Sequence, residues 1–431
     1  MELESGTDAP APAGDGATRP IRIGIEIRKP DPIESGQQRY LWRLAGWLAQ
    51  SGDEVHLICL RSVREGVTAP DGATLHRLHG MSRSRQMEVV AGLEWDALLL
   101  NPERSRRFRG VRANALRPAY GTEHFSQKLR SFRTPWELWP RRLLRVTPWA
   151  LLERRWERAF YEAPEPPPEI VAVSRYIRGE ILRSYRVPPE HVHVVPNGVD
   201  PAEFSPGERR ARRAEARAEF QIPDDAFCLL FMGHNFRLKG LWELLEALGR
   251  VDSLRGGGAG GRGDPRADPI HLLVAGKGRG RAQWRKARRL IRRHGLEGRV
   301  HLAGPIRPAI RAFAAADAFI HLTWHDSFGF VTLEAMASGL PVITTPHAGG
   351  SELVEDGEAG LIVDPGRTEA VAEGILRLID PEERARMGRV AADIGAEYPE
   401  TRAFARVREI LHLAAKRRAR QLSTTTPSPS S

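Results

Sequence analysis

Residues 318–346, AFIHLTWHDSFGFVTLEAMASGLPVITTP, decide the fold of this chain. The apolar run 318–322 predicts a buried strand because of its length and its Phe and Ile content. His-Asp-Ser at 325–327 then interrupts the run with residue types that cap helices. The segment 328–337 predicts a buried helix, and Pro341 opens a second short strand. Such a strand–helix–strand unit is typical of a parallel sheet. Its helix N-terminus is a candidate phosphate site, because free N–H groups and the macrodipole attract anions.

Two carboxylates frame the predicted helix, Asp326 before it and Glu334 two turns inside it. Eight residues at the helical rise span about 12 Å, comparable with the distance between the sugar and the ribose of a nucleotide sugar. For an arbitrary helix, the simpler interpretation is that Asp326 is an N-cap and Glu334 a solvated helix residue. The residues around them favour the functional interpretation.

The order of motifs here resembles the signature of retaining family 4 glycosyltransferases. A carboxylate precedes Ser327, Phe328 and Gly329, an apolar helix carries the second carboxylate, and Ala-x-Ala-Ser-Gly-Leu-Pro-Val follows. The resemblance implies the GT-B fold, an α/β architecture of two Rossmann-like parallel-sheet domains with the active site in the cleft between them. It also implies that Asp326 contacts the sugar, that the three residues after it belong to the donor-binding site, and that Glu334 contacts the ribose. Both carboxylates are normally Glu in that family, so Asp326 is one methylene shorter.

The length of 431 residues predicts two domains. We expect a disordered segment at 1–19, an acceptor-side domain at 20–204 and a domain for the nucleotide-sugar donor at 205–400. Residues 401–431 are expected to form a helix that returns to the first domain, and then a disordered basic tail. The tail is predicted to begin at the KRRARQL sequence near residue 416.

The composition indicates the cellular compartment of the protein and the charge of its partners. Cys59 and Cys228 both lie in apolar runs, so we interpret them as small buried residues in a reducing compartment. The chain opens on an acidic segment rich in Ala, Pro and Gly instead of a signal peptide, and no apolar run approaches the ~18 residues of a membrane span. These features predict a cytoplasmic protein that can sit on the inner face of the cytoplasmic membrane. The net charge of +11 predicts an anionic partner.

Basic and glycine residues follow two other predicted strands. Gly36, in the sequence SGQQR, begins a helix where a missing side chain would let a diphosphate approach the backbone. In the family this segment resembles the Gly-rich loop that faces the donor phosphates. Arg237 and Lys239 lie in the loop HNFRLKG after the first strand of the donor domain, where basic groups meet phosphates. Two solvated surface charges are the alternative interpretation, but Lys239 before Gly240 matches the family well.

Three further positions are candidates through the resemblance. The segment HAGGSELVEDGEAGLIVD resembles a loop and returning strand of the family, which places Gly349 and Gly350 near the sugar. His124, in AYGTEHF, could reach the sugar from a strand-to-helix loop, and a surface histidine is the alternative. The low-complexity stretch 252–269 is predicted to be a flexible insertion. No Asp-x-Asp, HExxH or Cys/His zinc spacing occurs, so neither a metal nor a cofactor is predicted.

Residues 124–160 combine nine basic residues and four tryptophans with three acidic residues. Basic residues interleaved with Trp and Leu suit an interfacial segment on anionic lipid. The alternative is a pair of surface helices whose tryptophans pack inward. Single-stranded nucleic acid also uses basic and stacking residues, but no recognised nucleic-acid motif accompanies them, so a nucleic-acid partner is not predicted.

Together these features predict a retaining, metal-independent glycosyltransferase. It would move a hexose from a nucleotide diphosphate sugar, a UDP-sugar, to a hydroxyl of a lipid-linked or polysaccharide acceptor. The segments SGQQR and FMGHNFRLKG and the basic first-domain stretch also resemble lipopolysaccharide-core glucosyltransferases of the same family. One alternative is a non-catalytic basic scaffold of this fold that binds membrane or RNA. Another is a nucleotide-sugar epimerase or phosphorylase on the same fold. The intact set of Lys239, Asp326 and Glu334 argues against the scaffold.

Overall fold

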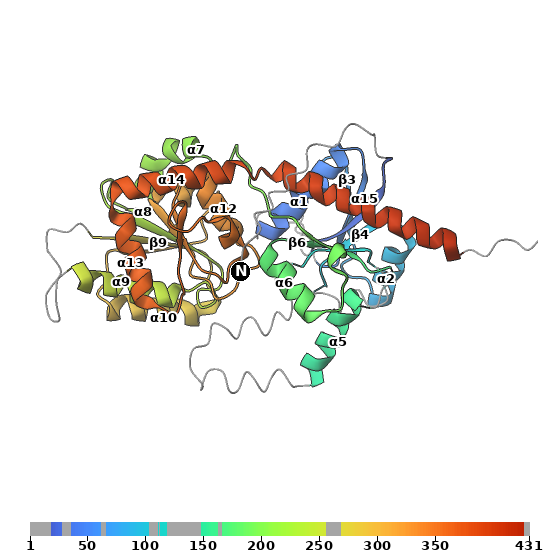
Figure 1. Cartoon of the computed structure of the whole chain (residues 1–431), viewed down its shortest axis with the longest axis horizontal. Coiled ribbons are helices and arrows are strands. Elements are labelled where there is room, and N and C mark those ends of the chain that lie inside the picture. The colour runs from blue at the N-terminus through green and yellow to red at the C-terminus, as the bar shows by residue number, and fades with distance from the viewer. Residues whose placement is uncertain are drawn as a thin grey trace, which may run out of the picture.

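The computed structural model describes residues 19–27, 36–61, 66–102, 111, 113–118, 148–162, 166–255 and 269–425. His124 and most of the predicted segments 1–19, 124–160 and 252–269 lie outside these described residues. The described chain forms two parallel sheets, each covered by helices, in two lobes (Figure 1). The predicted α/β architecture of two Rossmann-like domains is confirmed.

The first sheet has the strand order β3-β2-β1-β4-β5-β6-β7 among the described residues, and every pairing is parallel. Its strands are Arg22–Ile27 (β1), Glu54–Cys59 (β2), Ala73–Arg77 (β3), Ala97–Leu100 (β4), Ala115–Leu116 (β5), Glu169–Ala172 (β6) and Val192–Val194 (β7). Its helices are Gly36–Gln50 (α1), Arg83–Gly92 (α2), Pro148–Glu162 (α5) and Arg175–Ser184 (α6), with the 3-10 turn Pro189–His191 (η2). Ile23, Ile25 and Ile27 of β1 are buried, as expected for a strand covered on both faces.

The second sheet has the order β10-β9-β8-β11-β12-β13, again with parallel pairs only. Its strands are Cys228–Met232 (β8), His271–Ala275 (β9), Val300–Gly304 (β10), Ala318–Ile320 (β11), Val342–Thr344 (β12) and Gly360–Ile362 (β13). Its helices are Pro206–Ala211 (α7), Arg213–Phe220 (α8), Leu241–Arg255 (α9), Gly280–Arg293 (α10), Ile310–Ala315 (α11), Phe330–Ala337 (α12), Thr368–Ile379 (α13) and Pro381–Ala396 (α14), with the 3-10 turn Gly349–Leu353 (η3). Cys59 and Cys228 are buried with reduced thiols, as predicted.

The predicted strand–helix–strand unit is present as β11, α12 and β12. The helix begins later than predicted, because Gly329 is its N-cap and has a φ of 80°. This left-handed conformation is accessible to glycine without strain. No described side chain caps α12, so Asp326 is not its N-cap, and in the first turn the Thr332 amide donates to the Gly329 carbonyl at 2.9 Å.

The two lobes are joined twice. The linker after β7 crosses the chain after α14, where Val199 pairs with Pro399. Gly198 is required at this crossing, since a Cβ there would lie 2.2 Å from Cα of Glu400. Helix α15 (Glu400–Thr425) then runs back across the first domain (Figure 1). Arg408 Nε lies 2.7 Å from Asp53 Oδ2.

The basic tail predicted from residue 416 is wrong as far as Thr425, since this part is the end of α15. The reason is contact with the first domain. Arg417 Nη1 lies 2.6 Å from Oε1 of Glu169 at the start of β6, and Arg418 donates to the carbonyl of Trp95. These basic side chains therefore hold the helix in place.

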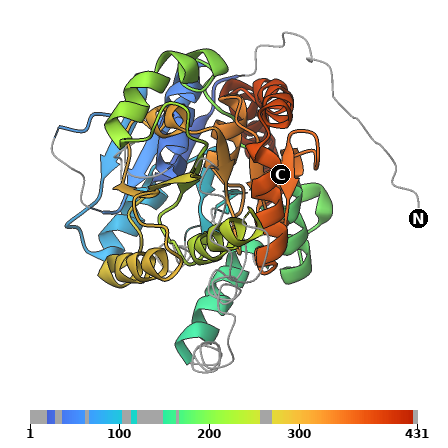
Figure 2. The same cartoon turned by 90° about the vertical axis from the view of Figure 1, so that its left-hand side faces the viewer.

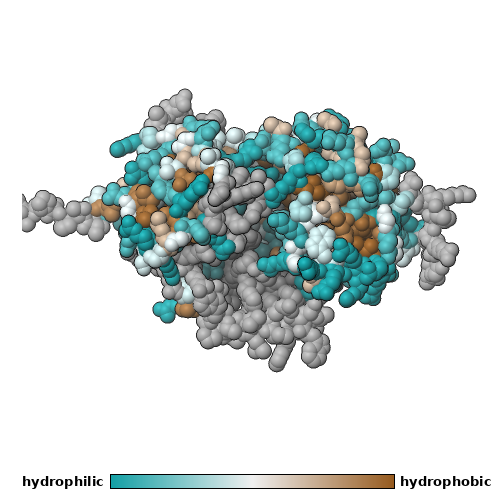
Figure 3. Space-filling view, turned by 180° about the vertical axis from the view of Figure 1, so that it is seen from behind, coloured by the Kyte–Doolittle hydropathy of each residue, from teal (hydrophilic) through white to brown (hydrophobic). Residues whose placement is uncertain are grey.

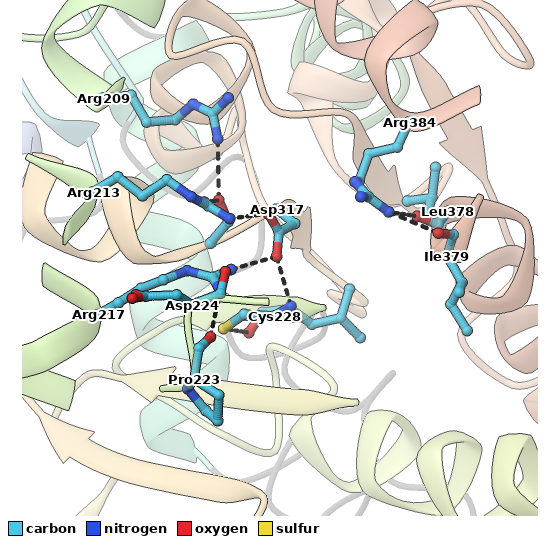
Figure 4. Close-up of polar contacts among 12 residues, drawn as sticks. Arg209, Arg213, Arg217, Pro223, Asp224, Cys228, Asp317, Leu378, Ile379 and Arg384 are labelled. Atoms are coloured by element: carbon cyan, nitrogen blue, oxygen red, sulfur yellow. Dashed lines mark hydrogen bonds and ion pairs between the residues drawn. The ribbon is translucent and has the colours of Figure 1, made fainter. Parts of the chain in front are cut away.

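Asp317 organises the amino-terminal edge of the second sheet (Figure 4). Its carboxylate accepts from Arg213 Nη2 at 2.6 Å, from Arg217 Nη2 at 2.7 Å and from the Cys228 amide at 2.8 Å. Burial and the nearby charge of Arg213 lower the pKa of Arg209 to about 10. Asp317 thus fastens α8 to the second domain, and Arg209 of α7 donates to the neighbouring Ala316 carbonyl at 3.1 Å.

Candidate active site

The candidate site lies where the carboxyl edges of the two sheets face each other. Loops 233–240 and 321–329 follow β8 and β11, which are neighbours in the second sheet. Across from them, the N-termini of α1 and α6 project from the first domain. Ligands of open α/β sheets bind at this edge of the strands.

Lys239 and Asp326 form the centre of the site. Gly240 has a φ of 78°, and a Cβ there would lie 2.0 Å from the carbonyl oxygen of Leu322. The β8–α9 loop therefore rests directly on the loop after β11, and the Lys239 ammonium forms an ion pair with Oδ2 of Asp326. Both side chains keep 18% exposure, so a ligand can reach the pair.

The Asp326 carboxyl is ionised at neutral pH. Burial by itself would favour the neutral acid, but the charge of Lys239 prevails and lowers the pKa of Asp326 below its ordinary value. The pair thus offers a cation for phosphate and an acceptor for hydroxyl groups at one place.

A fully buried histidine lies beneath Asp326. His321 Nε2 is 3.4 Å from Asp326 Oδ2, and Nδ1 is 3.2 Å from Oγ1 of Thr332 in α12. Burial lowers the pKa of His321 to about 3, so the ring is neutral. Sequence reasoning missed this residue, whose one signal is a histidine inside the apolar run AFIHL.

The loop that carries Asp326 is fixed by the glycines that follow β12. The Gly349 amide donates to the Asp326 carbonyl at 2.9 Å, and the Gly350 amide donates to the Phe328 carbonyl at 2.6 Å. A Cβ on Gly349 would lie 2.0 Å from the Ser327 carbonyl oxygen. The Phe328 side chain is buried. The structure thus brings Gly349 and Gly350 to the back of the loop, where their amides support Asp326.

Two helix N-termini converge beside this loop. A Cβ on Gly36, the first residue of α1, would lie 3.2 Å from Cδ2 of Phe330, the first residue of α12. The positive ends of two helix dipoles therefore point toward the same part of the cleft. The structure brings Gly36 to the helix that the sequence analysis selected as a phosphate site.

Glu334 is engaged by the opposite domain. Its side chain is 6% exposed and forms an ion pair with Arg39 of α1. Arg39 also lies 3.8 Å from Glu203 Oε1, through Nη1. Burial raises the pKa of Glu334, even though the charge of Arg39 acts in the opposite direction. Arg39 was missed as a site residue, although it ends the SGQQR segment.

Helix α6 makes a second bridge across the cleft that the sequence did not indicate. Ser174 Oγ donates to the Ser327 carbonyl at 2.8 Å, and Tyr176 Oη lies 3.0 Å from Nδ1 of His325. The Glu352 carboxylate accepts from the amides of Arg175 and Tyr176 at 2.9 and 2.5 Å. This helix N-terminus is occupied by a carboxylate of the other domain.

Two other predicted residues have different outcomes. Arg237 lies in the same loop as Lys239 and is partly exposed. His124 lies outside the described residues, so its place in the site stays a prediction. Within the described ranges, no cluster of three or more His, Cys, Asp or Glu side chains could hold a metal ion.

Family models match both domains of the chain. The model described as Glycosyltransferase Family 4 matches residues 35–203, and the model described as Glycosyl transferases group 1 matches residues 226–381. The chain is a family 4 glycosyltransferase.

Relatives of this glycosyltransferase carry the name D-inositol 3-phosphate glycosyltransferase. The one from Pseudarthrobacter chlorophenolicus is 27% identical over 412 residues, which cover 91% of this chain and 93% of the relative. The one from Arthrobacter sp. strain FB24 is 33% identical over 216 residues, 49% of this chain and 48% of the relative. The chain thus spans about half the length of the Arthrobacter relative.

Solved structures show the same fold. WaaG, a glycosyltransferase involved in lipopolysaccharide biosynthesis, has a TM-score of 0.71 at 20% identity, over 90% of this chain and 99% of WaaG. Anabaena HepE in complex with UDP-glucose has a TM-score of 0.69 at 18% identity, over 91% of this chain and 99% of HepE. These similarities confirm the GT-B fold of this glycosyltransferase.

Proposed function

We propose that this glycosyltransferase transfers a hexose from a UDP-sugar to a hydroxyl acceptor, with retention at the anomeric carbon and without a metal ion. The observation that carries the proposal is the ion pair of Lys239 and Asp326 beside the uncapped N-terminus of α12. This ion pair places a cation that can bind phosphate next to a carboxylate that can bind sugar hydroxyls.

Lys239 would act on the charge that develops in the reaction. As the bond from the anomeric carbon to the diphosphate breaks, negative charge grows on the phosphate oxygens and positive charge on the ring. Lys239, Arg237 and the N–H groups at Gly36 and at the start of α12 would stabilise the phosphate oxygens. Asp326 would bind sugar hydroxyls. The acceptor oxygen would attack on the departing group's own face, and its proton would pass to the leaving phosphate oxygen, which gives retention.

Glu334 would hold the ribose hydroxyls of the donor. Glu334 lies in α12, which begins after the loop that carries Asp326, and its ion pair with Arg39 leaves acceptor lone pairs for a ligand. Support for uridine comes from HepE of the same fold, which binds UDP-glucose. A lipid-linked or polysaccharide hydroxyl is the acceptor that we propose. The relatives' names favour an inositol phosphate as the second candidate.

Thermal shift with a panel of nucleotide sugars tests the donor, because a ligand that binds only the folded state raises the melting temperature. Product formation with the panel and both acceptor classes then follows, with and without EDTA. Expected results are stabilisation by a UDP-sugar, UDP release that requires an acceptor, and a product with the donor's anomeric configuration by NMR. Inversion would contradict retention, and loss of activity with EDTA would contradict metal independence. Stabilisation by none of the donors would favour the non-catalytic scaffold.

A further inference from the structure

Helix α10 presents a continuous basic face on the second domain. Its 14 residues include seven basic residues and no acidic one. All seven are exposed: Arg281, Arg285, Lys286, Arg288, Arg289, Arg292 and Arg293. Ala287, Leu290 and Ile291 anchor the opposite side of the helix in the domain. Figure 3, which shows the molecule from behind, has hydrophilic residues along the lower border of this domain, where α10 lies.

A hollow of about 730 Å³ opens between α10 and strand β10. Arg281, Arg285 and Arg288 line it on the helix side, and residues 302–304 line it on the strand side. β10 is at the end of the described sheet order, and its last three residues contribute to the hollow. Trp284 completes the lining. The lining therefore combines an apolar floor, made by Trp284 and Leu302, with three arginines.

We propose that this basic face is a docking surface for an anionic phospholipid membrane, with lipid phosphate groups bound by the arginines of the hollow. Charge complementarity is the first argument, because a surface of phospholipid phosphates attracts clustered Lys and Arg. The apolar floor is the second, since Leu302 and Trp284 offer contact to the glycerol and first methylenes of a lipid. The proposal goes beyond the proposed transfer reaction, in which α10 has no part.

The position of α10 also favours a flat partner. α10 and α5 come from different domains, and both lie on the lower side of the molecule in two perpendicular views (Figures 1 and 2). On α5, Leu152 is 39% exposed, and Arg155 and Arg158 are exposed. A bilayer beneath the molecule would therefore face both helices.

Single-stranded nucleic acid fits the face less well. Base recognition without sequence preference needs open aromatic faces. Trp284 is the aromatic residue of the hollow, and its ring packs edge-on against Phe236 at a centroid distance of 4.9 Å. Its Nε1 donates to the Lys277 carbonyl at 2.7 Å. Trp284 is therefore fixed as part of the floor.

Flotation of the full chain with vesicles tests the proposal. Vesicles of phosphatidylglycerol and phosphatidylcholine should bind the protein, vesicles of phosphatidylcholine alone should not, and binding should fall as salt rises. The triple variant Arg281→Gln, Arg285→Gln, Arg288→Gln should bind anionic vesicles about a hundredfold less tightly, since each charge near the surface contributes about fivefold.

The matched control removes the same charge from the other side of the molecule. Arg210, Arg389 and Arg402 are exposed residues of α7, α14 and α15, which run along the upper side in Figure 1. Their triple change to Gln should leave binding within about fivefold of the unchanged chain, because distant charges are screened. The melting temperature without ligand checks that both variants fold, whichever donor the enzyme uses.

Equal loss of binding in the two triple variants would overturn the proposal in favour of overall charge. Unchanged binding in the α10 variant would overturn it as well. Binding of a single-stranded oligonucleotide that the α10 variant loses, with vesicle binding intact, would assign the face to nucleic acid instead.

Discussion

Arg39 of the first domain and Glu334 of the second domain form an ion pair across the cleft, 295 positions apart in the sequence. Glu334 is nearly fully buried, while Arg39 keeps 30% exposure and also approaches Glu203. The carboxylate that we assign to the ribose therefore also holds the two domains together. Donor binding and the relative position of the domains depend on the same side chain.

Glu334→Gln should weaken binding of UDP about ten- to a hundredfold, because a hydrogen bond to a charged group contributes on the order of 1.5–3 kcal/mol. The chemical step should slow less, since the ribose is remote from the reacting carbon. Isothermal calorimetry with UDP measures the first effect, and single-turnover rates measure the second.

Arg39→Gln is the matched control, because it breaks the same ion pair and keeps the Glu334 carboxylate. It should cost less affinity for UDP than Glu334→Gln. Wild-type affinity in Glu334→Gln would show the ribose assignment to be wrong. Equal losses in the two variants would indicate that the bridge between the domains, and not the ribose contact, controls affinity.

Lys239→Ala should lower turnover by about two to three orders of magnitude at saturating donor. A preorganised contact to charge that develops in the transition state contributes roughly 3–4 kcal/mol. The melting temperature should change little, because Asp326 keeps access to water at 18% exposure. Lys277, exposed in the loop after β9, gives the control Lys277→Ala, which should be neutral. Near-normal turnover in Lys239→Ala would contradict its role, and a large fall in melting temperature would indicate a structural one.

Asp317→Asn should destabilise the second domain by about 3–5 kcal/mol, the usual cost of removing one partner of a buried ion pair. Arg217 is 1% exposed, and its guanidinium would lose its one described carboxylate (Figure 4). The melting temperature should therefore fall by about 10 °C. Asp225 is exposed and provides the control Asp225→Asn, whose melting temperature should fall by no more than about 1 °C. A small change in Asp317→Asn would mean that carbonyl acceptors suffice for the arginines.

Local sequence patterns predicted the central strand–helix–strand unit well. The alternation of apolar runs with a helix at 318–346 predicted β11, α12 and β12. The resemblance to family 4 glycosyltransferases placed Lys239 and Asp326 in one site. The structure brings them together because β8 and β11 are neighbouring parallel strands, whose following loops lie at one edge of the sheet. The error at the start of α12 has a local cause, since the left-handed Gly329 delays the helix by two residues.

Contacts between the domains could not be predicted from the sequence. The pairs Arg39–Glu334 and Ser174–Ser327 depend on how the two domains are placed relative to each other. The spacing of residues within one segment carries no information about that placement. The place of His321 in the site was missed for another reason. Inside an apolar strand pattern its burial is predicted, but its position beneath a carboxylate is a property of the fold.

The stretch 124–160 remains a sequence-based prediction, because most of it lies outside the described residues. If it binds anionic lipid, replacing Arg141, Arg142 and Arg145 by Gln should weaken binding to anionic vesicles, since each basic group near the surface contributes about 1 kcal/mol. UDP binding should be unaffected. Comparing the vesicle flotation of this variant with that of the α10 triple variant shows how much each of the two surfaces contributes to binding. Wild-type flotation after the 141–145 changes would favour tryptophans that pack inward.

His321 should make the second domain sensitive to mild acid. The unfolded chain binds a proton at this residue below about pH 6.5, whereas burial lowers the pKa in the folded state to about 3. Stability is therefore lost as the pH falls from about 6.5 toward 3, because the unfolded state binds more protons. By pH 5 this one residue should cost about 2 kcal/mol relative to pH 7.

His321→Gln should remove that pH dependence and keep a hydrogen-bonding partner for Thr332. Its melting temperature should fall by about 4–8 °C less between pH 7 and pH 5 than that of the unchanged chain, for a domain of this size. His234→Gln removes a histidine that is already exposed and should behave like the unchanged chain. The absolute stability of His321→Gln does not enter the comparison, because each protein is compared with itself at two pH values. Equal falls in all three proteins would show that His321 takes up its proton in the folded state without cost, and that its burial beneath Asp326 is less complete than the structure indicates.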